Sequence, residues 1–211
     1  MAAVIYADVR ECDRRLSRYF NSTRDQWIEV VKAAVAARAS CTDDNPLAAP
    51  GFRAWDAGTA RMRRIFRKEG WEKDDQDGIP SIVHRELKRK VIVVNTDIGT
   101  SDPECSPRNR TIKGAGTEKV IDLNNQLEMF RRREITKEPS DPLATWHLCI
   151  FDDGTLVRCE LSRPVLFKSG YFLLFSERIF ILRPGEWEKV SIATPAEQDS
   201  GQEFSIDVRR K

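Results

Sequence analysis

The segment 145–161 constrains the fold of this chain more than any other feature. Its sequence, TWHLCIFDDGTLVRCEL, places two alternating runs around Asp153-Gly154, a dipeptide typical of the two-residue turns that join antiparallel strands. A slip of one residue would move Arg158 and Glu160 onto the apolar face, so the pattern selects the register. The segment predicts an antiparallel hairpin with a face that a second layer must cover. The residues of that face are Trp146, Leu148, Ile150, Val157, Cys159 and Leu161.

The N-terminal third is predicted to be helical. Apolar residues recur every three or four positions over residues 8–20, 23–38 and 55–68, the spacing of amphipathic helices. Thr23 and Gln26 have the spacing of a capping box at the start of the second helix. Residues 40–52 are rich in proline, glycine and aspartate, which predicts a loop.

The centre of the chain combines a buried strand with a long loop. Residues 91–94 are four β-branched residues and predict a buried strand, whereas residues 81–90 fit either a strand or a helix. Residues 97–117 are rich in turn formers and predict a loop of about 20 residues, a length that is usually functional or disordered. A helix is expected over 117–133.

The predicted fold class is α+β, with an N-terminal helical unit, a mixed central segment with a long loop, and a C-terminal antiparallel β-sheet packed on helices. Residues 171–175 and 178–182 are expected to form two strands or one bent strand. Residues 137–142 read as a linker, and residues 204–208 as an edge strand. The chain divides into a helical region, 1–78, and an α+β region, 79–211, which together can also form one domain.

The charge balance is close to neutral. The 211 residues include 35 Lys and Arg against 33 Asp and Glu, a formal charge of +2. This balance excludes a histone-like polycation and an acidic mimic of DNA. It arises by cancellation, because basic blocks near 61–68, 85–90 and 108–119 alternate with an acidic block near 72–77.

The sequence favours a cytoplasmic protein that does not enter a membrane. No apolar run approaches the roughly 18 residues of a membrane span, and the first residues lack the pattern of a signal peptide. The five cysteines are widely spaced and form no CxxC pair, which predicts free thiols in a reducing compartment. The general texture resembles that of small proteins of bacterial genomes and their mobile elements, and this resemblance implies no particular activity.

Two basic segments are candidate binding sites for nucleic acid or another polyanion. The first is one face of the third predicted helix, which is either a phosphate-contacting surface or a solvated helix face. The second is the end of the long loop, where glycines and cations precede a helix N-terminus, an arrangement that favours anions. Its alternative is a mobile basic loop without a partner. The candidate residues are Arg61, Arg64, Lys68, Arg108, Arg110, Lys113 and Lys119.

Acidic residues after the 91–94 strand offer a second kind of site. Asp97, Asp102 and Glu104 are candidate metal ligands and catalytic residues, because carboxylates at a strand end can hold Mg²⁺ for phosphodiester hydrolysis. The Glu-x-Lys pattern of many such enzymes occurs only as Glu86-Leu87-Lys88. Otherwise, Asp enrichment is ordinary loop chemistry.

The polar face of the hairpin offers a third candidate site. With the two-residue turn, His147 faces Glu160 and Cys149 faces Arg158, so an acid/base pair or an activated thiol is conceivable there. Opposite charges across two strands are also normal stabilisers of a sheet.

Three functions follow from these patterns. The leading hypothesis is a non-enzymatic protein that binds DNA, RNA or another polyanion through its basic segments and needs no cofactor. The second is a Mg²⁺- or Mn²⁺-dependent phosphodiesterase or nuclease, and the third is a protein-interaction module, such as an inhibitor or a complex subunit. The sequence leaves open whether the protein is an enzyme.

Overall fold

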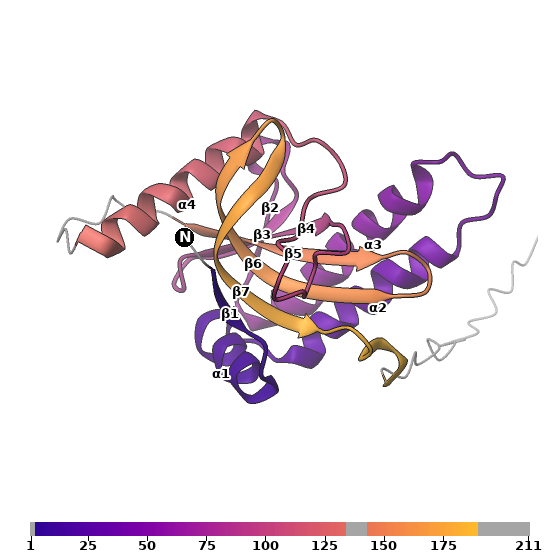
Figure 1. Ribbon diagram of the computed structural model, residues 1–211, viewed down its shortest axis with the longest axis horizontal. Coiled ribbons are helices and arrows are strands. Elements are labelled where there is room, and N and C mark those ends of the chain that lie inside the picture. Colours follow the sequence, from indigo (N-terminus) through magenta and orange to yellow (C-terminus); the bar gives the residue numbers. More distant parts are fainter. Residues whose placement is uncertain (1–2, 134–142, 190–211) are drawn as a thin grey trace, which may run out of the picture.

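The computed structural model describes residues 3–133 and 143–189. Within these ranges, four α-helices accompany a seven-stranded sheet with the order β1-β7-β6-β5-β4-β3-β2, which confirms the α+β class (Figure 1). The sheet is mixed, because β1 runs parallel to β7 and β4 runs parallel to β5. The strands are β1 (Val4–Tyr6), β2 (Glu72–Asp74), β3 (Ser81–His84), β4 (Arg89–Asn95), β5 (Ala144–Asp152), β6 (Val157–Lys168) and β7 (Tyr171–Leu182). The helices are α1 (Val9–Phe20), α2 (Arg24–Ala39), α3 (Ala49–Phe66) and α4 (Ala115–Arg133), and short 3₁₀ turns cover Arg67–Glu69, Gln76–Gly78 and Trp187–Lys189.

The ends of the first helices follow local capping chemistry. The Asp8 carboxylate accepts hydrogen bonds from the backbone N–H groups of Arg10 and Glu11 at the start of α1. The predicted capping box is present at the start of α2, where Thr23 and Gln26 exchange hydrogen bonds. α3 begins at Ala49 rather than near Trp55, so the last part of the predicted 40–52 loop is helical. A proline is tolerated in the first turn of a helix, where its missing N–H would have no intrahelical partner.

One face of the sheet packs against α1, α2 and α3. The predicted apolar face of the hairpin lies here in full, buried together with side chains from all three helices. Phe20 contributes an edge-to-face contact with Trp146, with ring centroids 5.1 Å apart, and a second one with Trp27 at 6.3 Å. This layer is the main hydrophobic core.

The register of the β5–β6 hairpin differs from the prediction by two residues. The observed pairs include Asp152 with Val157 and His147 with Ser162, so residues 153–156 form a four-residue connection instead of a two-residue turn. The Asp153 carboxylate accepts hydrogen bonds from the N–H groups of Thr155 and Leu156, which stabilises the longer connection. A shift of two residues preserves both faces, so the apolar pattern could not detect it. The predicted facing of His147 with Glu160 is therefore wrong, as is that of Cys149 with Arg158.

The ambiguous segments resolve into strands. Residues 81–90 form β3, a turn and the start of β4, and residues 171–182 form one continuous strand, β7. β1 and β2 were not predicted, and they bring strands from residues 1–78 into the same sheet as those from 79–211. The predicted linker at 137–142 and the predicted strand at 204–208 lie outside the described residues.

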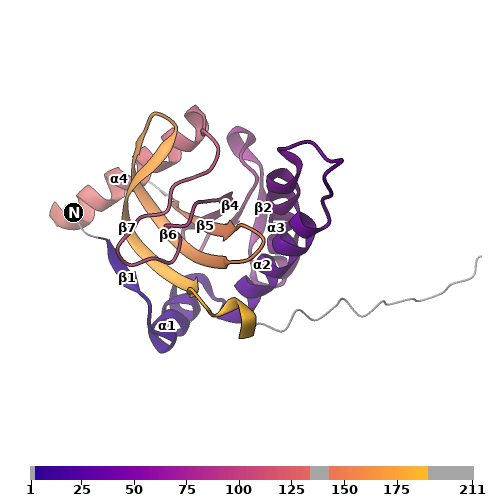
Figure 2. The same cartoon turned by 45° about the vertical axis from the view of Figure 1, so that its right-hand side comes forward.

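The other face of the sheet is covered by α4 and by the long segment that precedes it. Figure 2 shows this segment running across β5, β6 and β7. Asn124 fixes α4 to the sheet, because its side chain bonds to the backbone of Thr145 and to the carbonyl oxygen of Pro164 at 2.7–2.9 Å. Ile121 packs in a small apolar cluster with Val94 and Cys149. No helix in the described ranges is long and apolar enough to cross a membrane.

Candidate functional site

A buried ion pair fixes the first half of the long loop. The Arg178 guanidinium on β7 donates two hydrogen bonds to the Glu160 carboxylate on β6, at 2.9 and 2.6 Å, and both side chains are at most 2% exposed. The same guanidinium donates to three loop carbonyl oxygens, those of Gly99, Asp102 and Cys105, at 2.7–3.1 Å. The loop backbone therefore satisfies the remaining donors of a charged group that is buried in the sheet.

Asn109 fixes the second half of the loop. Its side-chain amide donates to the carbonyl oxygens of Thr111 and Gly170, at 2.7 and 2.8 Å, and its side-chain oxygen accepts from the N–H of Phe172 at 2.9 Å. The N–H of Lys113 also donates to the carbonyl oxygen of Gly170. The basic end of the loop is thus held against the β6–β7 turn.

These anchors place the end of the loop opposite the start of α3. The space between them is a hollow of about 440 Å³, which we call the outer hollow. The side chain of Asn95, at the end of β4, donates to the carbonyl oxygen of Gly51 at 2.7 Å and holds the first turn of α3 in position. The side chains that line the outer hollow include those of Arg38, Phe52, Trp55, Asn95, Arg110 and Lys113.

A second hollow of about 310 Å³ adjoins the first, and we call it the inner pocket. Trp55 and Lys113 line both, so the two spaces form one continuous surface, the Lys113 cleft. The inner pocket lies on the polar face of the sheet, at the N-terminus of α4. Its lining includes Ile92, Val94, Gly114, Thr117, His147 and Phe172.

Cations dominate the electrostatics of the cleft. Burial lowers the pKa of Arg110 below its usual value and the nearby Arg38 lowers it further, although the charges of Asp152, Asp153 and Asp97 oppose this shift. Burial also lowers the pKa of Lys113, whose ammonium group donates to the Thr111 hydroxyl at 3.1 Å. No carboxylate of the described chain lies within ion-pair distance of Lys113 or Arg110, whereas Arg38 lies 3.7 Å from Asp152. An anionic ligand would stabilise the charged form of both cations.

His147 lies at the base of the inner pocket. Its side chain is buried, at 1% residue exposure, and its ring contacts Phe172 edge to face at 4.8 Å between centroids. Burial lowers its pKa to about 3, and the positive charges of Lys113 and Lys90 contribute, so the imidazole is neutral at pH 7. Its Nδ1 atom has no hydrogen-bond partner in the described part of the chain.

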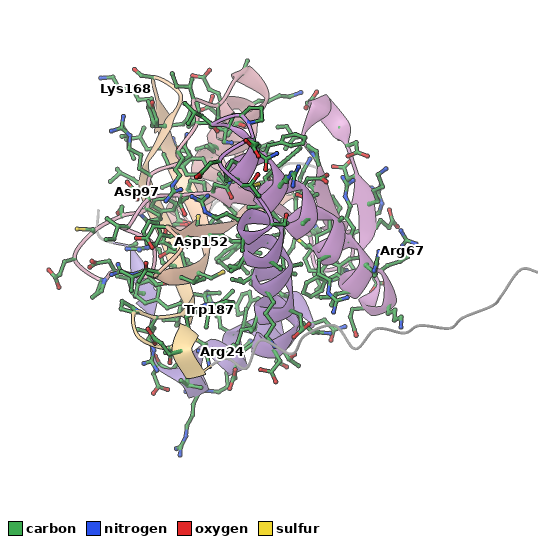
Figure 3. The ribbon with its side chains drawn as sticks, turned by 90° about the vertical axis from the view of Figure 1, so that its right-hand side faces the viewer. Arg24, Arg67, Asp97, Asp152, Lys168 and Trp187 are labelled. Carbon is green, nitrogen blue, oxygen red and sulfur yellow. The ribbon has the colours of Figure 1, made fainter. Side chains whose placement is uncertain are left out.

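The structure does not bring the two predicted basic segments together. Figure 3 places Arg67, just after α3, and Asp97, at the start of the loop, on opposite sides of the molecule. Arg61 pairs with Glu29 on α2 at 3.1 Å, and Arg64 and Lys68 are exposed near the end of α3. It is the opposite end of α3 that lines the cleft.

The four candidate polyanion-binding residues of the second basic segment do not share one environment. Arg110 and Lys113 line the cleft, whereas the Arg108 guanidinium stacks on the Tyr171 ring at 3.8 Å from its centroid. Lys119, on the first turns of α4, lies 3.4 Å from the Asp77 carboxylate. Two of the four, Arg110 and Lys113, therefore line the Lys113 cleft.

The three acidic candidates lie in the fixed part of the loop. One carboxylate oxygen of Asp97 accepts from the N–H groups of Gly99 and Arg108, and Asp102 accepts from the N–H of Glu104. Glu104 is exposed. Over residues 3–133 and 143–189, no three His, Cys, Asp or Glu side chains are grouped as metal ligands. Glu86-Leu87-Lys88 lies in the turn between β3 and β4 and not on a strand.

Sequence reasoning missed several residues that build the cleft. Arg38 lies in the last turn of α2 and Phe52 in the first turn of α3, and each resembles an ordinary surface residue until the loop is placed beside it. The sequence pairs His147 with Glu160 across the hairpin, whereas the structure places His147 opposite Ser162 and in the lining of the inner pocket. Arg178 carried no signal, because a strand arginine is normally exposed.

In comparisons with known proteins, no protein-family model, curated protein or solved structure matches this chain.

Proposed function

We propose that this protein binds single-stranded nucleic acid, or another polyanion of that kind, along the Lys113 cleft. The observation that carries the proposal is the combination of two cations that form no ion pair within the described residues, Lys113 and Arg110, with two aromatic side chains at the mouth of the same cleft. Proteins that bind single strands combine these two elements, because cations attract phosphates and aromatic rings stack on bases.

The aromatic pair supports stacking. Phe52 is 62% exposed, and its ring centroid lies 5.7 Å from that of Trp55. A large apolar ring that protrudes beside a cavity is more informative than a scattered surface leucine, because it can cover a ligand. A base placed in the outer hollow would contact this pair while its phosphates face Arg38 and Arg110.

Fluorescence anisotropy with a labelled single-stranded oligonucleotide tests the proposal. We expect binding that weakens steeply between about 50 and 200 mM salt, because neutralised phosphates release counterions. Phe52→Ala should cost about 1–3 kcal/mol of binding free energy, the usual contribution of one stacked base. The double variant Arg110→Ala/Lys113→Ala should weaken binding and reduce its salt dependence.

The exposed end of α3 offers a matched control. Arg64→Ala/Lys68→Ala removes the same charge from the other predicted basic segment, where the neighbouring aromatic rings of Phe66 and Trp71 are buried, and should change affinity little. Absence of binding at low salt would reject the proposal, as would equal losses of affinity in the cleft and control variants.

The phosphodiesterase hypothesis stays a prediction. Its test is cleavage of the oligonucleotide when it is incubated with the protein and Mg²⁺ or Mn²⁺, with the Asp97→Ala variant as the control. The protein-interaction hypothesis also stays a prediction.

A further inference from the structure

The inner pocket contains the N-terminus of a long helix. The N–H groups of Thr117 and Glu118 both donate to the carbonyl oxygen of Gly114, at 3.0 and 3.3 Å. The amides of Ala115 and Gly116 therefore precede the first bonds of α4. Amides in this position, with the positive end of the helix dipole, form a common site for anions.

Gly114 leaves this end of the helix open. Its φ angle is not in the left-handed region, so the backbone does not require a glycine. A side-chain carbon built there would meet no atom within 4 Å, so packing does not require one either. What the missing side chain does provide is access to the backbone from the pocket.

His147 provides an independent observation. Buried polar atoms in proteins are nearly always hydrogen-bonded, and an unpartnered one costs free energy of folding. The Nδ1 atom of His147 is unpartnered although the ring is one of the most buried polar side chains of the sheet. This Nδ1 atom is enclosed, so an acceptor that enters the pocket would reach the other ring nitrogen, Nε2, which also forms no hydrogen bond within the described part of the chain.

The shape of the inner pocket favours the end of a chain. The sheet closes one side of it, through Ile92, Val94 and His147, so a strand that enters from the outer hollow cannot continue in that direction. Its volume of about 310 Å³ is at the lower end of the range for small-molecule sites. The lining carboxylate, Asp77, lies beside Lys119, which balances its charge.

We infer that the inner pocket binds a terminal phosphate of a nucleic-acid strand, held by Lys113, the first amides of α4 and the imidazole of His147. The inference rests on the proposed function for the strand, whose last base would occupy the outer hollow. It adds a preference for phosphorylated ends, which a cleft that contacts only internal phosphates would not show.

The test compares three oligonucleotides of one sequence that carry a 5′-phosphate, a 3′-phosphate or neither, each with an internal fluorophore. We expect the full-length protein to bind one phosphorylated form at least about tenfold more tightly than the unphosphorylated form, equivalent to about 1.4 kcal/mol. In His147→Phe the preference should disappear, because phenylalanine keeps the contact with Phe172 and removes the nitrogen atoms. Lys113→Met is a second variant with the same expected loss of preference.

Two controls separate the pocket from the rest of the cleft. Phe52→Ala should weaken binding of all three oligonucleotides by the same factor and leave the preference intact. Thermal unfolding of His147→Phe should occur at the same temperature as in the unmodified protein, or higher, since the variant removes an unpartnered buried nitrogen. A loss of preference in a stable variant would therefore report the site rather than the fold.

Each outcome has a definite meaning. Salt-dependent binding without any preference for a phosphorylated end would overturn the inference and leave the proposed function standing. A preference that survives in both His147→Phe and Lys113→Met would place the phosphate elsewhere and also overturn it. A third outcome is that calorimetry detects binding of inorganic phosphate, lost in His147→Phe, while no oligonucleotide binds. This outcome would overturn the proposed function, and with it the inference that the phosphate belongs to a nucleic-acid strand.

Discussion

The two faces of the central sheet are built from different chemistry. The face beneath α1, α2 and α3 is apolar, and its residues come from every long strand. The opposite face buries Lys90, His147, Glu160 and Arg178, four side chains that are rarely buried without partners. The first face needs only volume and apolar surface to be stable. The second depends on individual hydrogen bonds, and it holds the loop that forms the cleft.

The polar face determines where the loop lies more than it determines how stable the fold is. An arginine–glutamate pair in a sheet contributes little net stability, because desolvation offsets the attraction. Arg178 nevertheless determines the path of the loop through three carbonyl oxygens. The polar face therefore holds the loop in position more than it stabilises the fold, and the position of the loop forms the cleft.

The largest effect is expected from breaking the Arg178 pair. Arg178→Met leaves Glu160 buried and unpaired, which should cost about 3–5 kcal/mol of unfolding free energy in urea titration. Hydrogen exchange of the amides of residues 97–113 should accelerate beyond the global loss, since the loop loses its anchor. Leu148→Ala on the apolar face is the comparison, because it should cost about 2–5 kcal/mol without any selective effect on the loop.

A double variant separates stability from position. Replacing both partners, as Glu160→Leu/Arg178→Met, should recover much of the lost stability, because an apolar pair of similar size removes the buried charge. The loop carbonyls still lack their donor, so exchange over residues 97–113 should remain fast. If the double variant restored slow exchange, the two faces would not differ as described.

The fold was predictable where its signals are local. The stripe of α2 and its Thr23 cap follow from spacing alone, and so does the apolar face of the hairpin. β1 and β2 have three residues each, too few for any periodicity, and they exist because longer neighbours offer them an edge. The hairpin register was wrong by an even number because only turn geometry, not burial, distinguishes the two solutions.

The site was predictable only in part, for the same reason. Arg110 and Lys113 could be chosen from local charge. Phe52 and His147 join them only because the loop crosses the sheet and α3 begins beside it, and both are tertiary facts. A segment rich in glycine and proline indicates a loop, but it does not indicate where a buried arginine will attach it.

A pH titration of stability tests the burial of His147 on the polar face. The pKa of His147 is about 3 in the folded protein and about 6.5 in an unfolded chain. Above pH 6.5 the imidazole is neutral in both states. As the pH falls from 6.5 towards 3, the unfolded state binds the proton first, so stability should fall by at most about 5 kcal/mol.

The His147→Phe variant isolates this contribution. Its urea unfolding free energy should fall less between pH 7 and pH 4 than that of the unmodified protein, and the two curves should run parallel above pH 7. Leu148→Ala should keep the full slope, because it changes the other face. Identical slopes in His147→Phe and the unmodified protein would show that the imidazole is protonated equally in both states.

The smallest change in unfolding free energy is expected from substituting two glycines of the polar face. The pair separates a glycine that serves packing from one that serves a ligand. Gly170, at the β6–β7 turn, has a φ of +84°, and a side-chain carbon there would approach Ile112 to 2.5 Å, so Gly170→Ala should cost about 1–2 kcal/mol. Gly114→Ala meets no atom and needs no left-handed backbone. Its gain in chain entropy opposes the poorer helix cap, so the net change should stay within about 0.5 kcal/mol. Urea titration of both variants compares them directly. Equal losses would mean that the open space beside Gly114 is as necessary to the fold as the turn at Gly170, whereas a neutral Gly114→Ala that loses the preference for phosphorylated ends would assign that space to the ligand.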